Sequence, residues 1–176
     1  MRRLDRTSRD EQFRAYVTRS RGSLLRTATL LSSGNRHRAE DLVQTVLLRM
    51  YLSWPRIRDD TRDAYARKMV VNAHLDDRRR PHVRREQTHA EVPDVVADAV
   101  EPDDTDAAVF EALAELPPRM RAAVVLRHVH DVSVAEAADA LGCSEGTVKS
   151  QTARGLAHLR TTLNGNATVM KGQSHE

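Results

Sequence analysis

Polar side chains that can form hydrogen bonds gather in one short stretch near the C-terminal end of the sequence. Within residues 131–160 they occur at close spacing after a glycine: Thr147, Lys149, Ser150, Gln151 and Arg154. Such hydroxyl, amide, ammonium and guanidinium groups pair with base edges and phosphates of DNA. The chemistry that this stretch indicates is therefore recognition of a nucleic acid rather than bond cleavage.

Two helices must position these side chains. Ser133 followed by Glu136 forms a capping box, so the first helix is expected to begin there. Gly142 stands where that helix must end, because glycine tolerates a positive φ. Ser144 then caps a second helix. The inner face of that helix consists of Val148, Leu156 and Leu159. The pattern predicts a helix-turn-helix, although a hairpin that only builds a core would share it.

The composition favours helices and excludes several classes of protein. Aromatic residues make up 3% of the 176 residues, which suits a helical bundle better than a β-sandwich. Cys143 is the only cysteine, so no intrachain disulfide can form. No apolar run approaches the roughly 20 residues of a membrane span, and the first residues lack the apolar core of a signal peptide. We expect a cytoplasmic protein without direct membrane insertion.

Charge is distributed unevenly along the chain. Residues 1–80 carry 19 Lys+Arg against 10 Asp+Glu, a net charge of +9. Residues 81–104 carry 2 against 7, net −5, and residues 105–176 carry 7 against 8, net −1. A basic first half suggests a polyanionic partner.

The first half of the chain predicts a helical bundle over residues 10–80. Apolar residues recur at helical spacing in residues 10–31, 36–54 and 63–79. A turn at residues 32–35 and Pro55 separate these segments. Three amphipathic helices with short links form a small bundle.

The second half predicts another small helical domain. Residues 81–104 hold three prolines, excess acid and no apolar period, which predicts a flexible acidic linker. Residues 105–163 form helices on either side of Leu116-Pro117-Pro118, followed by the helix-turn-helix. Residues 164–176 are polar and expected to be disordered. The predicted fold class is all-α, with two small helical domains.

Several motifs occur along the chain in one order: AEDLVQ at residues 39–44, a helix at 65–72 followed by Asp76 and Arg78, LPPR at 116–119 and GCSEGTVKS at 142–150. This order resembles that of the extracytoplasmic-function sigma factors, the small bacterial initiation subunits of RNA polymerase. The match covers roughly residues 10–162. Residues 70–75 and 148–160 look especially like the actinobacterial SigE-like branch.

The resemblance implies that the AEDLVQ helix docks on the clamp helices of the polymerase β′ subunit. Asp41, Leu42 and Gln44 match that motif, and we add Arg49 from the same helix. An exposed leucine beside polar groups suits an interface hot spot. Without the resemblance, the simpler interpretation is that Leu42 belongs to the core. Thr45 stands where the family often has glutamate.

The resemblance also assigns promoter contacts to both domains. Residues 56–80 match the part that reads the minus-ten element and takes a flipped base. The candidate residues there are Arg58, Asp60, Thr61, Arg67, Lys68, Asn72, Arg78 and Arg79. The candidates for the minus-thirty-five element are Ser144, Thr147, Lys149, Ser150, Gln151 and Arg154. Tyr65 stands where the family usually has tryptophan, and we expect it to be a core aromatic.

The implied function is that of an alternative sigma factor with no catalytic residue, metal, cofactor or small-molecule substrate. Its implied partners are core RNA polymerase, through the β′ clamp helices and the β flap, promoter DNA, and an anti-sigma factor of the kind that holds many relatives inactive. A stand-alone helix-turn-helix regulator is the alternative, but it would not need the AEDLVQ helix. An enzyme would need a metal site at His128, His130 and Cys143, yet histidines two apart on a helix point to different sides.

Overall fold

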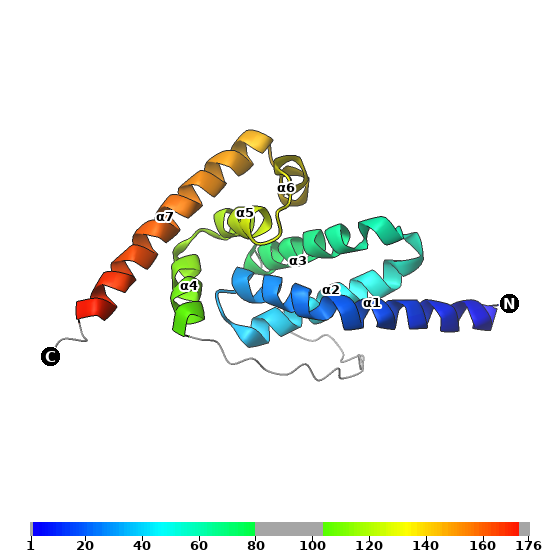
Figure 1. Cartoon of the computed structure of the whole chain (residues 1–176). Coiled ribbons are helices and arrows are strands. Elements are labelled where there is room, and N and C mark those ends of the chain that lie inside the picture. Colours follow the sequence, from blue (N-terminus) through cyan, green and yellow to red (C-terminus); the bar gives the residue numbers. More distant parts are fainter. Residues whose placement is uncertain (1, 80–103, 173–176) are drawn as a thin grey trace. The chain divides into compact units, whose positions relative to one another are not determined.

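The computed structural model describes residues 2–79 and 104–172, with side chains described for residues 7–76 and 107–165 (Figure 1). Within these ranges every regular element is a helix, which confirms the all-α fold class. The chain forms two compact units. The described residues of the first are 2–28 and 36–79, and those of the second are 29–35 and 104–172. The predicted linker, 81–104, lies almost entirely outside the described residues.

The first unit contains three α-helices and two short 3₁₀-helices. They are α1 (Arg2–Leu31), α2 (Arg36–Ser53), η1 (Trp54–Arg56), η2 (Asp59–Thr61) and α3 (Arg62–Arg79). Helix α1 begins at Arg2, eight residues before the predicted start. No proline or glycine occurs before Gly22, and a single glycine costs a helix only about 1 kcal/mol, so α1 continues without a break.

The core of the first unit is built on the inner sides of α2 and α3, which pack together. Trp54, which follows α2 directly, is only 2% exposed. The rings of Phe13 and Tyr16 on α1 each have a centroid 5.1 Å from that of the indole. The buried apolar residues of α2 and α3 are Ala39, Leu42, Val43, Val46, Leu47, Met50, Ala66, Val70, Val71 and Ala73.

The second unit contains α4 (Asp104–Glu115), α5 (Pro118–His128), α6 (Val134–Leu141) and α7 (Glu145–Gly172). The capping box is confirmed, since Glu136 N donates to Ser133 Oγ at 3.2 Å and Ser133 N donates to Glu136 Oε2 at 3.0 Å. Gly142 has φ 59° and ends α6 as predicted. Helix α7 packs against α4, α5 and α6, so it is the central helix of this unit.

Helix α7 is longer than the sequence pattern indicates. The prediction of disorder from residue 164 is wrong as far as Gly172, because α7 continues to that residue. Extending an existing helix by one residue is far easier than nucleating a new one. Gly165 alone therefore does not end it.

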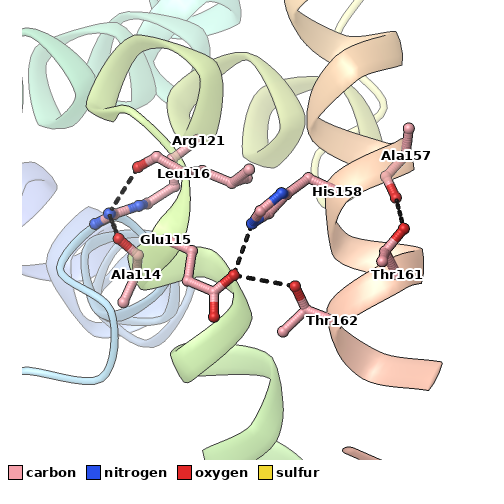
Figure 2. Close-up of polar contacts among 8 residues, drawn as sticks. All are labelled: Ala114, Glu115, Leu116, Arg121, Ala157, His158, Thr161 and Thr162. Atoms are coloured by element: carbon pink, nitrogen blue, oxygen red, sulfur yellow. Dashed lines mark hydrogen bonds and ion pairs between the residues drawn. The ribbon is translucent and has the colours of Figure 1, made fainter. Parts of the chain in front are cut away.

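Arginine side chains hold helix ends in the second unit. Arg121 is 2% exposed, and its Nη2 atom donates to the carbonyl oxygens of Ala114 at 3.0 Å and Leu116 at 3.1 Å (Figure 2). Arg119 Nη2 likewise donates to the carbonyl oxygen of Leu141 at the end of α6. These guanidinium groups satisfy carbonyl oxygens that a helix C-terminus leaves without an intrahelical partner.

Candidate functional site

One face of α2 is exposed and carries two leucines. Leu48 is 44% and Leu52 is 70% exposed, and the two are one helical turn apart. The expected contact residues Asp41, Gln44 and Arg49 are also exposed. Leu42 is only 6% exposed and packs in the core, so the expectation that its side chain is exposed is wrong, while its contact with polymerase stays a prediction. The apolar part of this face is instead formed by Leu48 and Leu52.

The loop before α3 forms a second exposed surface. Arg58, Asp60 and Thr61 are all exposed. Arg58 Nη2 lies 2.8 Å from Asp60 Oδ2, and Thr61 Oγ1 donates to the carbonyl oxygen of Arg58 at 3.0 Å. The loop therefore folds back on itself and presents its polar groups outward.

The exposed side of α3 continues from this loop. Tyr65 is 39% exposed, so its predicted place in the core is wrong. Asn72 is exposed and Lys68 half-buried, and the 65, 68, 72 spacing puts all three residues on one side of the helix. Arg67 is half-buried and shares the opposite side with the buried residues Val70 and His74. Arg67 thus stands apart from this surface, while the predictions for Arg78 and Arg79 concern side chains outside the described residues.

Helix α1 supports the base of the loop. Tyr16 OH donates to the carbonyl oxygen of Arg62 at 3.5 Å. Burial raises the pKa of Tyr16 to about 12, because a phenolate would lose its hydration. The phenol, which any tyrosine keeps at neutral pH, therefore remains a hydrogen-bond donor even at an alkaline pH where an exposed tyrosine would ionise.

The second helix of the helix-turn-helix presents a basic face. Lys149, Ser150, Ala153 and Arg154 are exposed, and their spacing places them on one side of α7. The other side packs against the unit, with Val148 fully buried and Leu156 and Leu159 in the apolar cluster around Leu116. Lys149 and Arg154 therefore extend from a fixed helix.

Gln151 does not belong to this basic face. It is half-buried, three residues from Val148 on the packed side of α7, and its Oε1 atom is fully covered.

The hydroxyl groups in the first turn of α7 form hydrogen bonds within that turn. Thr147 N donates to Ser144 Oγ at 3.2 Å, and Ser150 Oγ donates to the carbonyl oxygen of Thr147 at 3.0 Å. Of the six residues predicted here, Lys149 and Arg154 have the exposure and charge best suited to DNA.

A carboxylate fastens α7 to α4. Glu115 Oε2 lies 2.7 Å from His158 Nε2 and accepts a hydrogen bond from Thr162 Oγ1 at 3.0 Å (Figure 2). All three side chains are on the surface, and the sequence pattern did not reveal them. Together with Gly155, against which α5 packs closely, this contact fixes the direction of α7.

The described residues offer neither a metal-binding group nor a membrane-spanning helix. In residues 2–79 and 104–172 no three His, Cys, Asp or Glu side chains come together as a metal-binding group. In the same part of the chain none of the helices is both long and apolar enough to cross a membrane.

Comparison with known proteins shows the family to which the chain belongs. The family model "Sigma-70 region 2" matches residues 16–87, and "Sigma-70, region 4" matches residues 106–159. The RNA polymerase sigma-E factor of Streptomyces coelicolor is 37% identical over 153 residues, which cover 86% of this chain and 86% of that protein. The chain belongs to the extracytoplasmic-function sigma factors.

A second relative agrees with this assignment, and a solved structure shares the fold. The ECF RNA polymerase sigma factor SigM of Mycobacterium tuberculosis is 37% identical over 164 residues, covering 90% of this chain and 79% of that protein. The sigma factor RpoE of Bartonella quintana, solved with the anti-sigma factor NepR, shares the fold with a TM-score of 0.67 at 23% identity, covering 88% and 98% of the two chains.

The function follows at the level of the family. The protein is an alternative sigma factor that directs transcription initiation. A stand-alone regulator is not favoured, because such a protein would need the region 4 helix-turn-helix but not the region 2 domain that also matches.

Proposed function

We propose that the first unit binds core RNA polymerase through the exposed face of α2. The observation that carries this proposal is the exposure of Leu48 and Leu52, at 44% and 70%. Two leucines in water beside Asp41, Gln44 and Arg49 are poorly explained by folding alone, whereas an apolar centre with a polar rim is typical of a protein interface. The partner surface is the β′ clamp helices, which the family resemblance implies.

The loop of residues 58–61 and the exposed side of α3 then recognise the minus-ten element. Arg58, Asp60 and Thr61 supply hydrogen-bonding groups for an unpaired base, and Asn72 supplies an amide. Tyr65 offers a ring on which a base can stack, an interaction worth about 1–3 kcal/mol per base. Lys68 contributes positive charge toward the phosphates.

The second unit recognises the minus-thirty-five element through α7. Lys149 and Arg154 are the main contacts, and Ser144, Thr147 and Ser150 supply secondary hydrogen bonds. The helices before them, α4 and α5, pack on the β flap. Catalysis belongs to the polymerase, so the protein acts as a non-catalytic specificity subunit. Its place of action is the cytoplasm, at the nucleoid.

An anti-sigma factor is a further proposed partner. The structural relative from Bartonella quintana was solved in complex with one. The same apolar residues that face core polymerase, Leu48 and Leu52, would be an effective target for masking, because covering them prevents assembly of the holoenzyme.

Core binding should depend on Leu48 and Leu52. In a pull-down with core RNA polymerase lacking sigma, the variant Leu48→Ala/Leu52→Ala is expected to bind about 30-fold more weakly, as for loss of an interface hot spot of about 2 kcal/mol. Arg14→Ala/Arg26→Ala is the control, because both arginines are exposed on α1 and belong to none of the proposed contact surfaces. Binding of the double variant at the wild-type level would remove α2 from the interface.

A further inference from the structure

A guanidinium group connects the exposed loop of residues 58–61 with the buried aromatic core of the first unit. Arg62, the first residue of α3, places its Cζ atom 3.8 Å from the ring centroid of Trp54. Its Nη2 atom also pairs with the carboxylate of Asp59, the first residue of η2. The side chain of Arg62 is 16% exposed and that of Asp59 is 84% exposed. Arg62 thus contacts both the buried indole of Trp54 and the exposed carboxylate of Asp59.

The indole beneath Arg62 is itself held in place. Trp54 is 2% exposed. The Phe13 ring meets it nearly edge-on, at an interplanar angle of 86°, and the Tyr16 ring at 54°. Aromatic pairs with these geometries are favourable, and a guanidinium over an indole face adds a cation–π attraction. Arg62 therefore stacks on a surface that has little freedom to move.

The backbone next to Arg62 is fixed by α1, the helix that also carries Phe13 and Tyr16. Tyr16 OH donates to the carbonyl oxygen of Arg62, and Ser20 Oγ donates to Asp63 Oδ1, each at 3.5 Å. The residues that precede Arg62 in the loop, 58–61, are exposed. The pairing of Arg62 with Asp59 consequently transmits the rigidity of α1 and Trp54 to the loop.

We propose that Arg62 is a positioning residue for minus-ten recognition, holding the η2 loop in the conformation that accepts an unpaired base without touching DNA itself. This inference rests on the proposed role of residues 58–61. A loop that is already ordered loses less conformational entropy when it binds. The pair also neutralises the Asp59 carboxylate, which would otherwise repel nearby phosphates.

A double-mutant cycle tests the inference in the assembled holoenzyme. The measured quantity is the affinity for a forked promoter DNA whose minus-ten element is single-stranded. Arg62→Gln and Asp59→Asn should each weaken binding about tenfold, the scale expected when an interface loop loses its preorganisation. The double variant should bind no more weakly than Arg62→Gln alone, because both changes break one connection.

Controls separate positioning from a general loss of structure. Arg26→Gln removes the same charge from an exposed position on α1 and should bind forked DNA like the wild type. Asp59→Asn alters an exposed side chain, so it should leave the melting temperature and core binding unchanged while weakening forked DNA. Additive effects of the two loop changes, or wild-type affinity of Asp59→Asn, would overturn the inference. If the wild-type holoenzyme binds forked DNA no better than core alone, the proposed function itself fails, and the inference fails with it.

Discussion

Replacing Lys149 and Arg154 together by alanine should abolish recognition of the upstream promoter element while core binding stays at the wild-type level. Both side chains are exposed on α7, whereas Val148 of the same helix is buried and Leu156 packs in the apolar cluster around Leu116. A well-placed basic contact to a base edge contributes about 1–3 kcal/mol of discrimination. Loss of two such contacts should reduce promoter affinity by about 30-fold or more.

The measurement is run-off transcription, together with holoenzyme binding to duplex fragments that contain or lack the minus-thirty-five element. Arg14→Ala/Arg26→Ala is a charge-matched control, since both of these arginines are exposed on α1. The control should retain the preference for the element. A Lys149/Arg154 variant that loses core binding instead would contradict the division of labour between the two units.

Gly155→Ala should destabilise the second unit although alanine is the better helix former. A Cβ atom at position 155 would lie 2.5 Å from Val124 Cγ2 and 3.2 Å from Met120 Cγ. Val124 is only 5% exposed, so α5 and α7 would have to move apart. Overpacking of this kind typically costs about 1–3 kcal/mol, which outweighs the gain of about 1 kcal/mol in helix propensity.

Unfolding must be followed separately in the two units. Trp54 is the one tryptophan of the sequence and lies in the first unit, so its fluorescence transition should stay unchanged. The far-UV circular dichroism transition of the second unit should shift to a lower temperature. Gly165→Ala is the matched control, because no atom lies within 4 Å of its added Cβ. It should leave stability unchanged or raise it, and a stable Gly155→Ala protein would show that α5 yields readily.

Local rules were sufficient for the helix-turn-helix. The capping box at Ser133 and Glu136, the left-handed Gly142 and the Ser144 cap each involve residues within a few positions of one another. Their outcome is decided by backbone sterics and short hydrogen bonds, which the sequence specifies directly. The all-α class follows from the same signals repeated along the chain.

Burial on α2 and α3 depends on distant neighbours and was predicted less well. Leu42, Leu48 and Leu52 have the same side chain on one helix, so composition cannot tell which of them faces α3. Tyr65 was expected inside and is 39% exposed. Leu42 was expected outside only because of the family resemblance, and its 6% exposure agrees with the simpler interpretation from the sequence alone. The choice is made by the packing partners of each side of the helix, which lie many residues away.

The position of α7 depends on a missing side chain and on a long-range pair. Gly155 carries no turn or strain signal, because its role is to let α5 approach. Glu115 and His158 are 43 residues apart in the sequence. Neither feature produces a pattern within a short window, so sequence reasoning predicted the helix but not the contacts that set its direction.

The arginines that fasten helix ends also bear on how ionic strength would act on this protein. Arg119, Arg121 and Arg127 all donate to backbone carbonyl oxygens within the second unit. They are therefore committed to the fold, and they would release few condensed counterions when the unit meets DNA. Counting basic residues therefore overstates the electrostatic contribution of this unit to DNA affinity. Its binding to DNA would depend on a small number of surface cations and on the rest of the holoenzyme.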